Sequence, residues 1–238
     1  MGYTFQFNDV LEYWPMLVKG IGATICFTLA AAALSLVLGT LGVAARRSRH
    51  RPMQWAGRTY LELIRNTPVL VQLFILYFGL PTVGVHLSPN TAAVVGLSIY
   101  NGAYVMEILR GGIQGVHKSQ LEAGLSIGMS RVQVFRYIVA LPALEKIYPA
   151  LTSQFVLLML GTSIVSAIGA EDLTARANDI QSLNFRSLEV YIVSAIIYMA
   201  LVIVMRLGLR LLGTRLFYYR QRPTVMTAYR RQLAAALR

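Results

Sequence analysis

The chain has 238 residues, of which 56% are hydrophobic and only 13% charged, with a formal net charge of +12. This balance is too apolar for a soluble domain of ordinary composition, and it predicts a chain whose solvent is a lipid bilayer. The positive charge does not indicate nucleic acid, because the basic residues lie between apolar runs rather than along a basic stripe with interleaved aromatics. Cys26 is the single cysteine, which excludes an intrachain disulfide and a paired-cysteine metal or redox site.

Five apolar runs are long enough to cross a membrane, since a hydrocarbon core takes about 20 residues of helix. We predict an all-α membrane protein with one transmembrane domain that occupies residues 1–238. Its five transmembrane helices are placed at about 21–45, 59–80, 91–109, 147–168 and 190–209. Pro68 lies within the second run and is expected to kink that helix, because proline removes a backbone donor.

Charges between the runs predict the orientation of the chain. Segment 46–51 is strongly basic, and a basic tail at 210–238 follows the fifth run without an acidic residue. Segment 80–90, in contrast, contains no Lys, Arg, Asp or Glu. Because cytoplasmic loops carry the excess of Lys and Arg, we expect the N-terminus outside, the C-terminus inside and segment 115–145 in the cytoplasm.

Segment 115–145 joins the third and fourth spans and is predicted to fold as two short helices. The first covers 120–127, Gly128 permits a sharp turn with positive φ, and Ser130 can cap the second helix. Pro142 is expected to stop or bend that second helix. Such a knob suits a groove in another protein, and the alternative is an amphipathic connector that lies in the membrane interface.

The motif within this segment is specific. It consists of Glu122-Ala123-Gly124, then Gly128 and Ser130, and Leu141-Pro142 at the end. It resembles the EAA loop of ABC importer permeases, with Gly124 where that loop usually has alanine, a change that loosens a helix slightly. The resemblance implies that these seven residues form a cytoplasmic coupling loop for an ATPase.

Further motifs occur in the same order along the chain. They are Arg65-Asn66-Thr67-Pro68, Tyr77-Phe78-Gly79-Leu80-Pro81, Arg110-Gly111-Gly112-Ile113, Thr162-Ser163 and Asp172-Leu173-Thr174. The set resembles the polar amino-acid uptake family, which includes the histidine, glutamine, glutamate and arginine/opine permeases. The resemblance implies a multi-pass permease subunit in the bacterial inner membrane, which takes up polar amino acids or opine-like derivatives by alternating access. Import would be ATP-driven and dependent on a binding protein.

The resemblance also implies several partners. They are an ABC ATPase dimer, a periplasmic or lipid-anchored substrate-binding protein, a second permease chain in a homo- or heterodimer, and membrane lipids. The nearest match to a phosphate-binding loop begins at Gly112 but has His117 where its second glycine belongs. We therefore expect no enzymatic activity and no cofactor in this chain, with ATP and Mg²⁺ on the partner ATPase. No metal site is expected, because the three histidines lie in separate loops.

Polar residues inside the spans are costly unless they face the bundle interior or a path. The candidates for a substrate path are Asn101, Tyr104, Gln154, Thr162, Ser163 and Ser166. The candidates for a gate are two acid–base pairs spaced three residues apart, Glu62 with Arg65 and Glu107 with Arg110. The alternatives are ordinary hydrogen bonds between helices for the first set and local ion pairs for the second.

Two other classes of function stay as alternatives, an ion-coupled secondary transporter and a non-transporting membrane anchor. The first usually needs acidic residues at mid-membrane and an internal inverted repeat, and neither is visible in the sequence. The second leaves the polar groups within the spans without a purpose. Leu160 and Gly161 stand where many relatives of the resembled family carry a charged pair, so a different permease chain is a candidate for the main substrate contacts.

Overall fold

The computed structural model describes residues 3–217, and every regular element in that range is a helix. Four helical stretches are long and apolar enough to cross a membrane, and a fifth is reached if a bent pair of helices counts as one span. The four are α2 (Trp14–Arg46), α5 (Pro89–Gln114), the continuous stretch Arg131–Ile168, and α10 (Ser187–Leu216). Each extends beyond its predicted range, and most of the predicted basic tail, residues 218–238, lies outside the described residues.

Helices α2 and α5 form the centre of the molecule because small residues let their backbones approach closely. A Cβ added at Gly39 would lie 2.6 Å from Val105 Cγ1, and one at Gly42 would lie 2.5 Å from Met106 Sδ. Glycine is the residue that membrane helices use for such contacts, where packing rather than water drives association. The pair α2–α5 is therefore the frame against which the other helices are placed.

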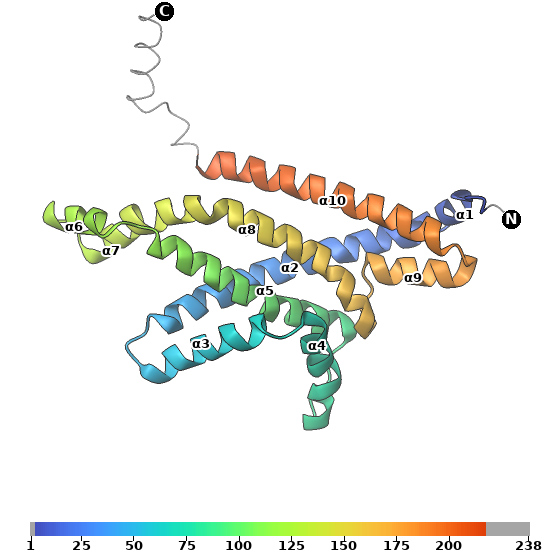
Figure 1. Cartoon of the computed structure of the whole chain (residues 1–238), viewed down its shortest axis with the longest axis horizontal. Coiled ribbons are helices and arrows are strands. Elements are labelled where there is room, and N and C mark those ends of the chain that lie inside the picture. Colours follow the sequence, from blue (N-terminus) through green and yellow to red (C-terminus); the bar gives the residue numbers. More distant parts are fainter. Residues whose placement is uncertain (1–2, 218–238) are drawn as a thin grey trace, which may run out of the picture.

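The second predicted span is divided into two helices. Helix α3 (Arg51–Arg65) meets the stretch Val69–Val83 at an angle of 111°. That stretch contains α4 (Val69–Phe74), the π-helix η1 (Ile75–Gly79) and the 3₁₀ helix η2 (Leu80–Val83). Proline disfavours helical geometry at the residue before it, and Pro68 itself is extended with ψ of 135°. Gln72 Nε2 then donates to Ile64 O at 2.8 Å and to Thr67 O at 3.0 Å, which satisfies carbonyls at the end of α3. Pro68 thus lies at a break between two helices that is sharper than the expected kink, and α4 projects away from the body (Figure 1).

The second short helix of segment 115–145 does not end at Pro142. Helix α7 (Arg131–Gln133) continues through the π-helix η3 (Val134–Ala140) into α8 (Leu141–Gly161) and the 3₁₀ helix η4 (Thr162–Ile168). These elements make one stretch of 38 residues. Pro142 lies in the first turn of α8, directly after the wide π turns, where the missing donor and the ring are accommodated without a break.

The two ends of the molecule differ in structure. Helix α6 (Lys118–Ser126) and α7 lie at one end, and α1 (Asn8–Leu11) and α9 (Leu173–Asn184) lie at the other (Figure 1). The segment 170–187, which follows the fourth predicted span, is thus mostly the helix α9. Its buried residues Leu173 and Ile180 pack with Leu17 of α2 and Val190 of α10. This end is therefore a packed surface rather than a loose connection.

Candidate docking segment and substrate path

A glycine turn and a capped helix shape the docking segment, residues 115–145. Gly128 has φ of +84°, a conformation that favours glycine because it has no Cβ. Ser130 Oγ accepts from Gln133 N at 3.3 Å, and Gln133 Oε1 accepts from Ser130 N at 2.8 Å. This capping box satisfies two backbone donors at the start of α7. The positive φ at Gly128 and the cap at Ser130 both match the sequence prediction.

Gly124 is a point of contact between α6 and η3. It is buried, and a Cβ added there would overlap Ile138 Cδ1 and lie 3.1 Å from Val134 Cγ2. The effect of this glycine is therefore close packing of the two short helices rather than loosening of α6. The apolar side chains that follow in the second helix are divided, because Val134 is buried while Val132 and Phe135 are exposed.

The other coupling candidates are on the surface of this segment. Glu122, Ala123, Leu141 and Pro142 are all exposed. Ile127 and Val132 are exposed by 78% and 75%, an unusual state for large aliphatic side chains. Between the two short helices lies a hollow of about 400 Å³, with Gln120, Ala123, Gly124, Ile127, Ile138 and Pro142 as its lining. The segment therefore offers a partner both exposed apolar side chains and a concave surface.

Asn101 and Gln154 meet in the interior of the bundle. Asn101 is fully buried, and its Nδ2 donates to Ser35 Oγ at 2.7 Å. Gln154 Nε2 donates to Asn101 Oδ1 at 2.9 Å, so the chain of hydrogen bonds joins α2, α5 and α8. The structure adds Ser35 to these two predicted path candidates. In the sequence, Ser35 is one of several small polar residues in the first apolar run, and nothing else there indicates its contact with Asn101.

Tyr104 and Gln154 line a hollow of about 330 Å³ between α5, α8 and the start of α4. Tyr100, which sequence reasoning did not select, lies one helical turn from Tyr104, and its hydroxyl donates to that of Tyr104 at 3.3 Å. Gly161 is also part of the lining, together with apolar side chains. The hollow thus combines two aromatic hydroxyls with one amide in an apolar wall, a lining typical of small-molecule sites.

Thr162, Ser163 and Ser166 are placed differently from the other path candidates. Their hydroxyls donate to the carbonyls of Met159, Leu160 and Ser163, each at 2.8 Å. Each bond is to the residue three positions earlier, as expected where the backbone tightens into the 3₁₀ helix η4. These contacts are local, and none of the three residues lines the hollow at Tyr104.

One of the two candidate gate pairs is formed. Arg110 Nε donates to Glu107 Oε2 at 2.9 Å, and Arg46 Nη1 lies 4.0 Å from the same oxygen. Within residues 3–217, no ion pair joins Glu62 and Arg65. The guanidinium of Arg65 instead lies over the ring of Tyr104, 5.6 Å from its centroid. Arg65 therefore connects the gate candidates to the hollow, an arrangement that the helical spacing of Glu62 and Arg65 does not reveal.

Asp172 joins α9 to α10 at the opposite end. Its carboxylate accepts from Ala175 N at 2.9 Å as the cap of α9, and from the Tyr198 hydroxyl at 2.9 Å. Burial raises the pKa of the Asp172 carboxyl above its ordinary value of 3.8, and the two hydrogen bonds act in the opposite direction. Among the described residues, no group of three His, Cys, Asp or Glu side chains could hold a metal ion.

This raised pKa predicts a pH-dependent stability. Between pH 3.8 and the raised pKa, the folded state binds more protons at Asp172 than the unfolded state, so the free energy of unfolding falls as pH rises through that window. Asn at this position keeps the helix cap but has no proton to lose. We expect the melting temperature of wild type, relative to Asp172→Asn, to fall between about pH 4 and about pH 7. Thermal unfolding in detergent measures the two melting temperatures. If wild type and Asp172→Asn differ in melting temperature by the same amount at both pH values, the prediction is contradicted.

Comparison with known proteins supplies the family. The model for "Binding-protein-dependent transport system inner membrane component" matches residues 38–218 of the chain. The chain belongs to this family. It is therefore an inner-membrane permease component. Membership of this family implies an ATPase partner and a substrate-binding protein. The resemblance drawn from the motifs of the sequence is confirmed.

The relatives of this permease include transporters named for amino acids. It is 34% identical over 214 residues to the glutamine transport system permease protein GlnP of Escherichia coli strain K12, covering 89% of this chain and 98% of that one. It is 32% identical over 201 residues to the arginine transport system permease protein ArtQ of Bacillus subtilis strain 168, covering 84% of this chain and 92% of that one.

Solved structures share the fold of the permease. A crystal structure of an amino acid ABC transporter with histidines is 36% identical, has a TM-score of 0.83, and covers 90% of this chain and 100% of its own. An inward-facing MetNI methionine ABC transporter has a TM-score of 0.69 with 17% identity, covering 84% of this chain and 96% of that one, and shows likeness of fold alone.

Proposed function

We propose that the permease imports polar amino acids or opine-like derivatives by alternating access, and that the docking segment receives the ATPase that drives it. The relatives named for glutamine and arginine support the substrate class. The ATPase supplies the ATP and Mg²⁺ sites, and this chain supplies the path. A substrate-binding protein delivers the amino acid at the opposite end, onto α9 and segment 80–90, with the N-terminus outside and the C-terminus inside.

The observation that carries this proposal is the shape of the docking segment. Contact at Gly124 and the turn at Gly128 fix α6 against η3, while Ile127, Val132 and Phe135 stay exposed. Exposed apolar groups on a well-packed knob indicate a surface that another protein covers. An ion-coupled transporter or a passive anchor would leave this surface without a partner.

The continuous stretch Arg131–Ile168 connects the docking segment to the path. It begins in α7, and its later residues Gln154 and Gly161 line the hollow at Tyr104. Movement of the ATPase can therefore change the hollow through rigid displacement of α8, without a relay of side-chain contacts. In this mechanism the ion pair of Glu107 with Arg110 and the contact of Arg65 with Tyr104 act as the gate.

A second permease chain completes the path. Phe74, Ile75 and Phe78 are exposed on the arm formed by α4 and η1, which projects from the body of this chain (Figure 1). The hollow carries no acidic or basic residue in its lining. A charged group of the substrate therefore finds its partner on the second chain, whether that chain is identical or different.

Charge reversal at Glu122 tests the docking assignment. The side chain is exposed on α6, so Glu122→Lys leaves the fold intact but places a positive charge on the proposed interface. We expect recovery of the ATPase with the tagged permease, from native membranes, to fall by about tenfold. Glu12→Lys is the matched control, since Glu12 is exposed and directly follows α1, which lies at the opposite end (Figure 1). Equal recovery with both variants would refute docking at this segment.

A further inference from the structure

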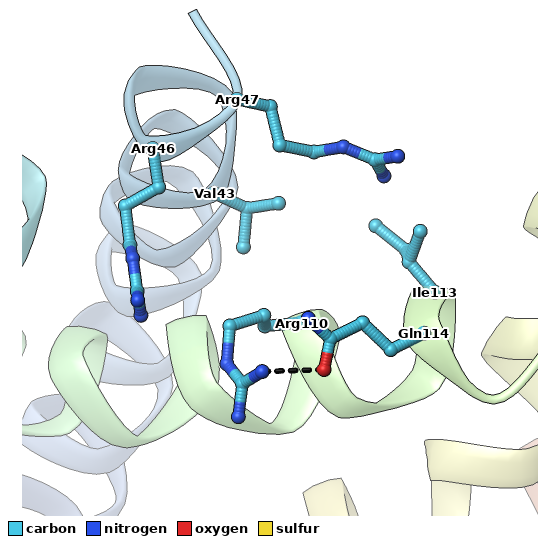
Figure 2. Close-up of a pocket in the computed structure, with 6 residues that line it drawn as sticks. All are labelled: Val43, Arg46, Arg47, Arg110, Ile113 and Gln114. Carbon is cyan, nitrogen blue, oxygen red and sulfur yellow. Dashed lines mark hydrogen bonds between the residues drawn. The ribbon is translucent and has the colours of Figure 1, made fainter. Parts of the chain in front are cut away.

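Three arginines gather where α2 ends beside α5. Arg46 and Arg47 belong to the end of α2, and Arg110 belongs to α5 (Figure 2). Together with Val43, Ile113 and Gln114 they line a hollow of about 190 Å³. Because α2 is a spanning helix that ends at this point, the hollow lies at the level of the membrane interface.

The charge of this hollow is not balanced within the described part of the chain. Glu107 is the carboxylate that the arginines share, paired with Arg110 and 4.0 Å from Arg46. Gln114 Oε1 accepts from Arg110 and holds its guanidinium in place, as the dashed line in Figure 2 shows. Arg47 is exposed and has no carboxylate within 4.0 Å among residues 3–217. Two positive charges therefore remain for an anion, and guanidinium groups suit the oxygens of a phosphate.

An apolar groove adjoins the basic hollow. It has a volume of about 450 Å³ and shares Val43, Arg47 and Ile113 with the hollow. Phe135 of η3 and Leu144 of α8 form its far wall. All residues that line the groove are apolar except Thr40 and Arg47. A free anion would explain the arginines but would have no use for this groove.

We propose that an anionic phospholipid of the phosphatidylglycerol class binds here, with its phosphate among Arg46, Arg47 and Arg110 and part of an acyl chain in the groove. Basic pockets between membrane helices are suited to anionic headgroups, and the apolar groove adds the energy of burying acyl groups. The bound lipid touches α2, α5 and η3 together. It thereby joins the central frame to the docking segment.

The test uses full-length permease purified with its accompanying subunits and placed in nanodiscs of phosphatidylcholine and phosphatidylglycerol. Native mass spectrometry after release counts the retained lipids. Wild type is expected to retain phosphatidylglycerol preferentially, and the double variant Arg46→Gln/Arg47→Gln to lose that preference by at least about tenfold. Arg49→Gln/Arg51→Gln removes the same charge from the neighbouring segment outside the hollow and is expected to behave as wild type. Should the first double variant fail to fold, Arg47→Gln alone replaces it.

Two further measurements separate the lipid from other anions. Ala44→Phe fills the groove without a change of charge and is expected to reduce phosphatidylglycerol retention as well. Phosphatidylglycerol is expected to raise the melting temperature of the wild-type permease, and inorganic phosphate is expected not to reproduce that rise. Unchanged retention in the Arg46/Arg47 variant, equal loss in the Arg49/Arg51 control, unchanged retention in Ala44→Phe, or full stabilisation by phosphate would each overturn the proposal.

Discussion

Replacement of Gly128 by valine is expected to reduce binding-protein-dependent uptake by at least about tenfold while the permease stays in the membrane. Gly128 has φ of +84°, where an L residue costs roughly 1–2 kcal/mol and a β-branched one more. To relieve that strain, the chain must give up the bonds from Gly128 N to Leu125 O and from Met129 N to Gly124 O, at 3.0 and 3.1 Å. The two short helices would then lose their relative orientation. Uptake into vesicles, corrected for permease level, measures the loss.

Gly128→Asn is the matched control for this prediction. Asparagine enters the left-handed region more readily than other residues with a Cβ, and open space surrounds Gly128. We therefore expect Gly128→Asn to keep most of the uptake. If the valine variant transports as well as the asparagine variant, the turn at Gly128 is not needed for coupling.

Replacement of Gly124 by leucine is expected to have an effect of similar size by a different route. The new side chain would overlap Ile138 and press on Val134, so α6 would be pushed away from η3. We expect transport-coupled ATPase activity to fall by about tenfold or more, with the ATPase subunit's own fold unaffected. Gly124→Ala should be mild, because the nearest atom is the far end of the Ile138 side chain, which can move.

A second substitution tests the cause of that loss. Ile138→Ala removes the side chain that a larger residue at 124 would overlap, so the double variant Gly124→Leu/Ile138→Ala is expected to regain part of the lost activity. A steric cause requires this rescue. If Ile138→Ala lowers activity further in the leucine background, Gly124 is needed for direct contact with the partner rather than for packing.

Local chemistry explains which features could be predicted from the sequence. The turn at Gly128 and the cap at Ser130 depend on single residue types and their neighbours, and both are present. The spanning helices reach beyond the predicted spans, because composition marks the apolar middle of a helix and not its caps. The predicted stop or bend at Pro142 is absent because proline is tolerated in the first turn of a helix, and Pro142 lies in the first turn of α8.

Contacts between distant segments account for what was missed. The contact of Arg65 with Tyr104 and the hydrogen bond of Asn101 with Ser35 join residues 39 and 66 positions apart. Helical spacing compares neighbours three or four residues apart and favoured Glu62 as the partner of Arg65. The break between α3 and α4 at Pro68 likewise depends on Gln72, whose side-chain amide donates hydrogen bonds to the carbonyls of Ile64 and Thr67.

The uninterrupted stretch Arg131–Ile168 has a mechanical consequence. At 1.5 Å per residue its 38 residues make a lever of about 57 Å, with the docking segment at one end and η4 near Asp172 at the other. If such a lever tilts about its middle by roughly 6°, its two ends move about 3 Å in opposite directions. A single small tilt of this stretch would thus close the path on one side of the membrane as it opens the path on the other side.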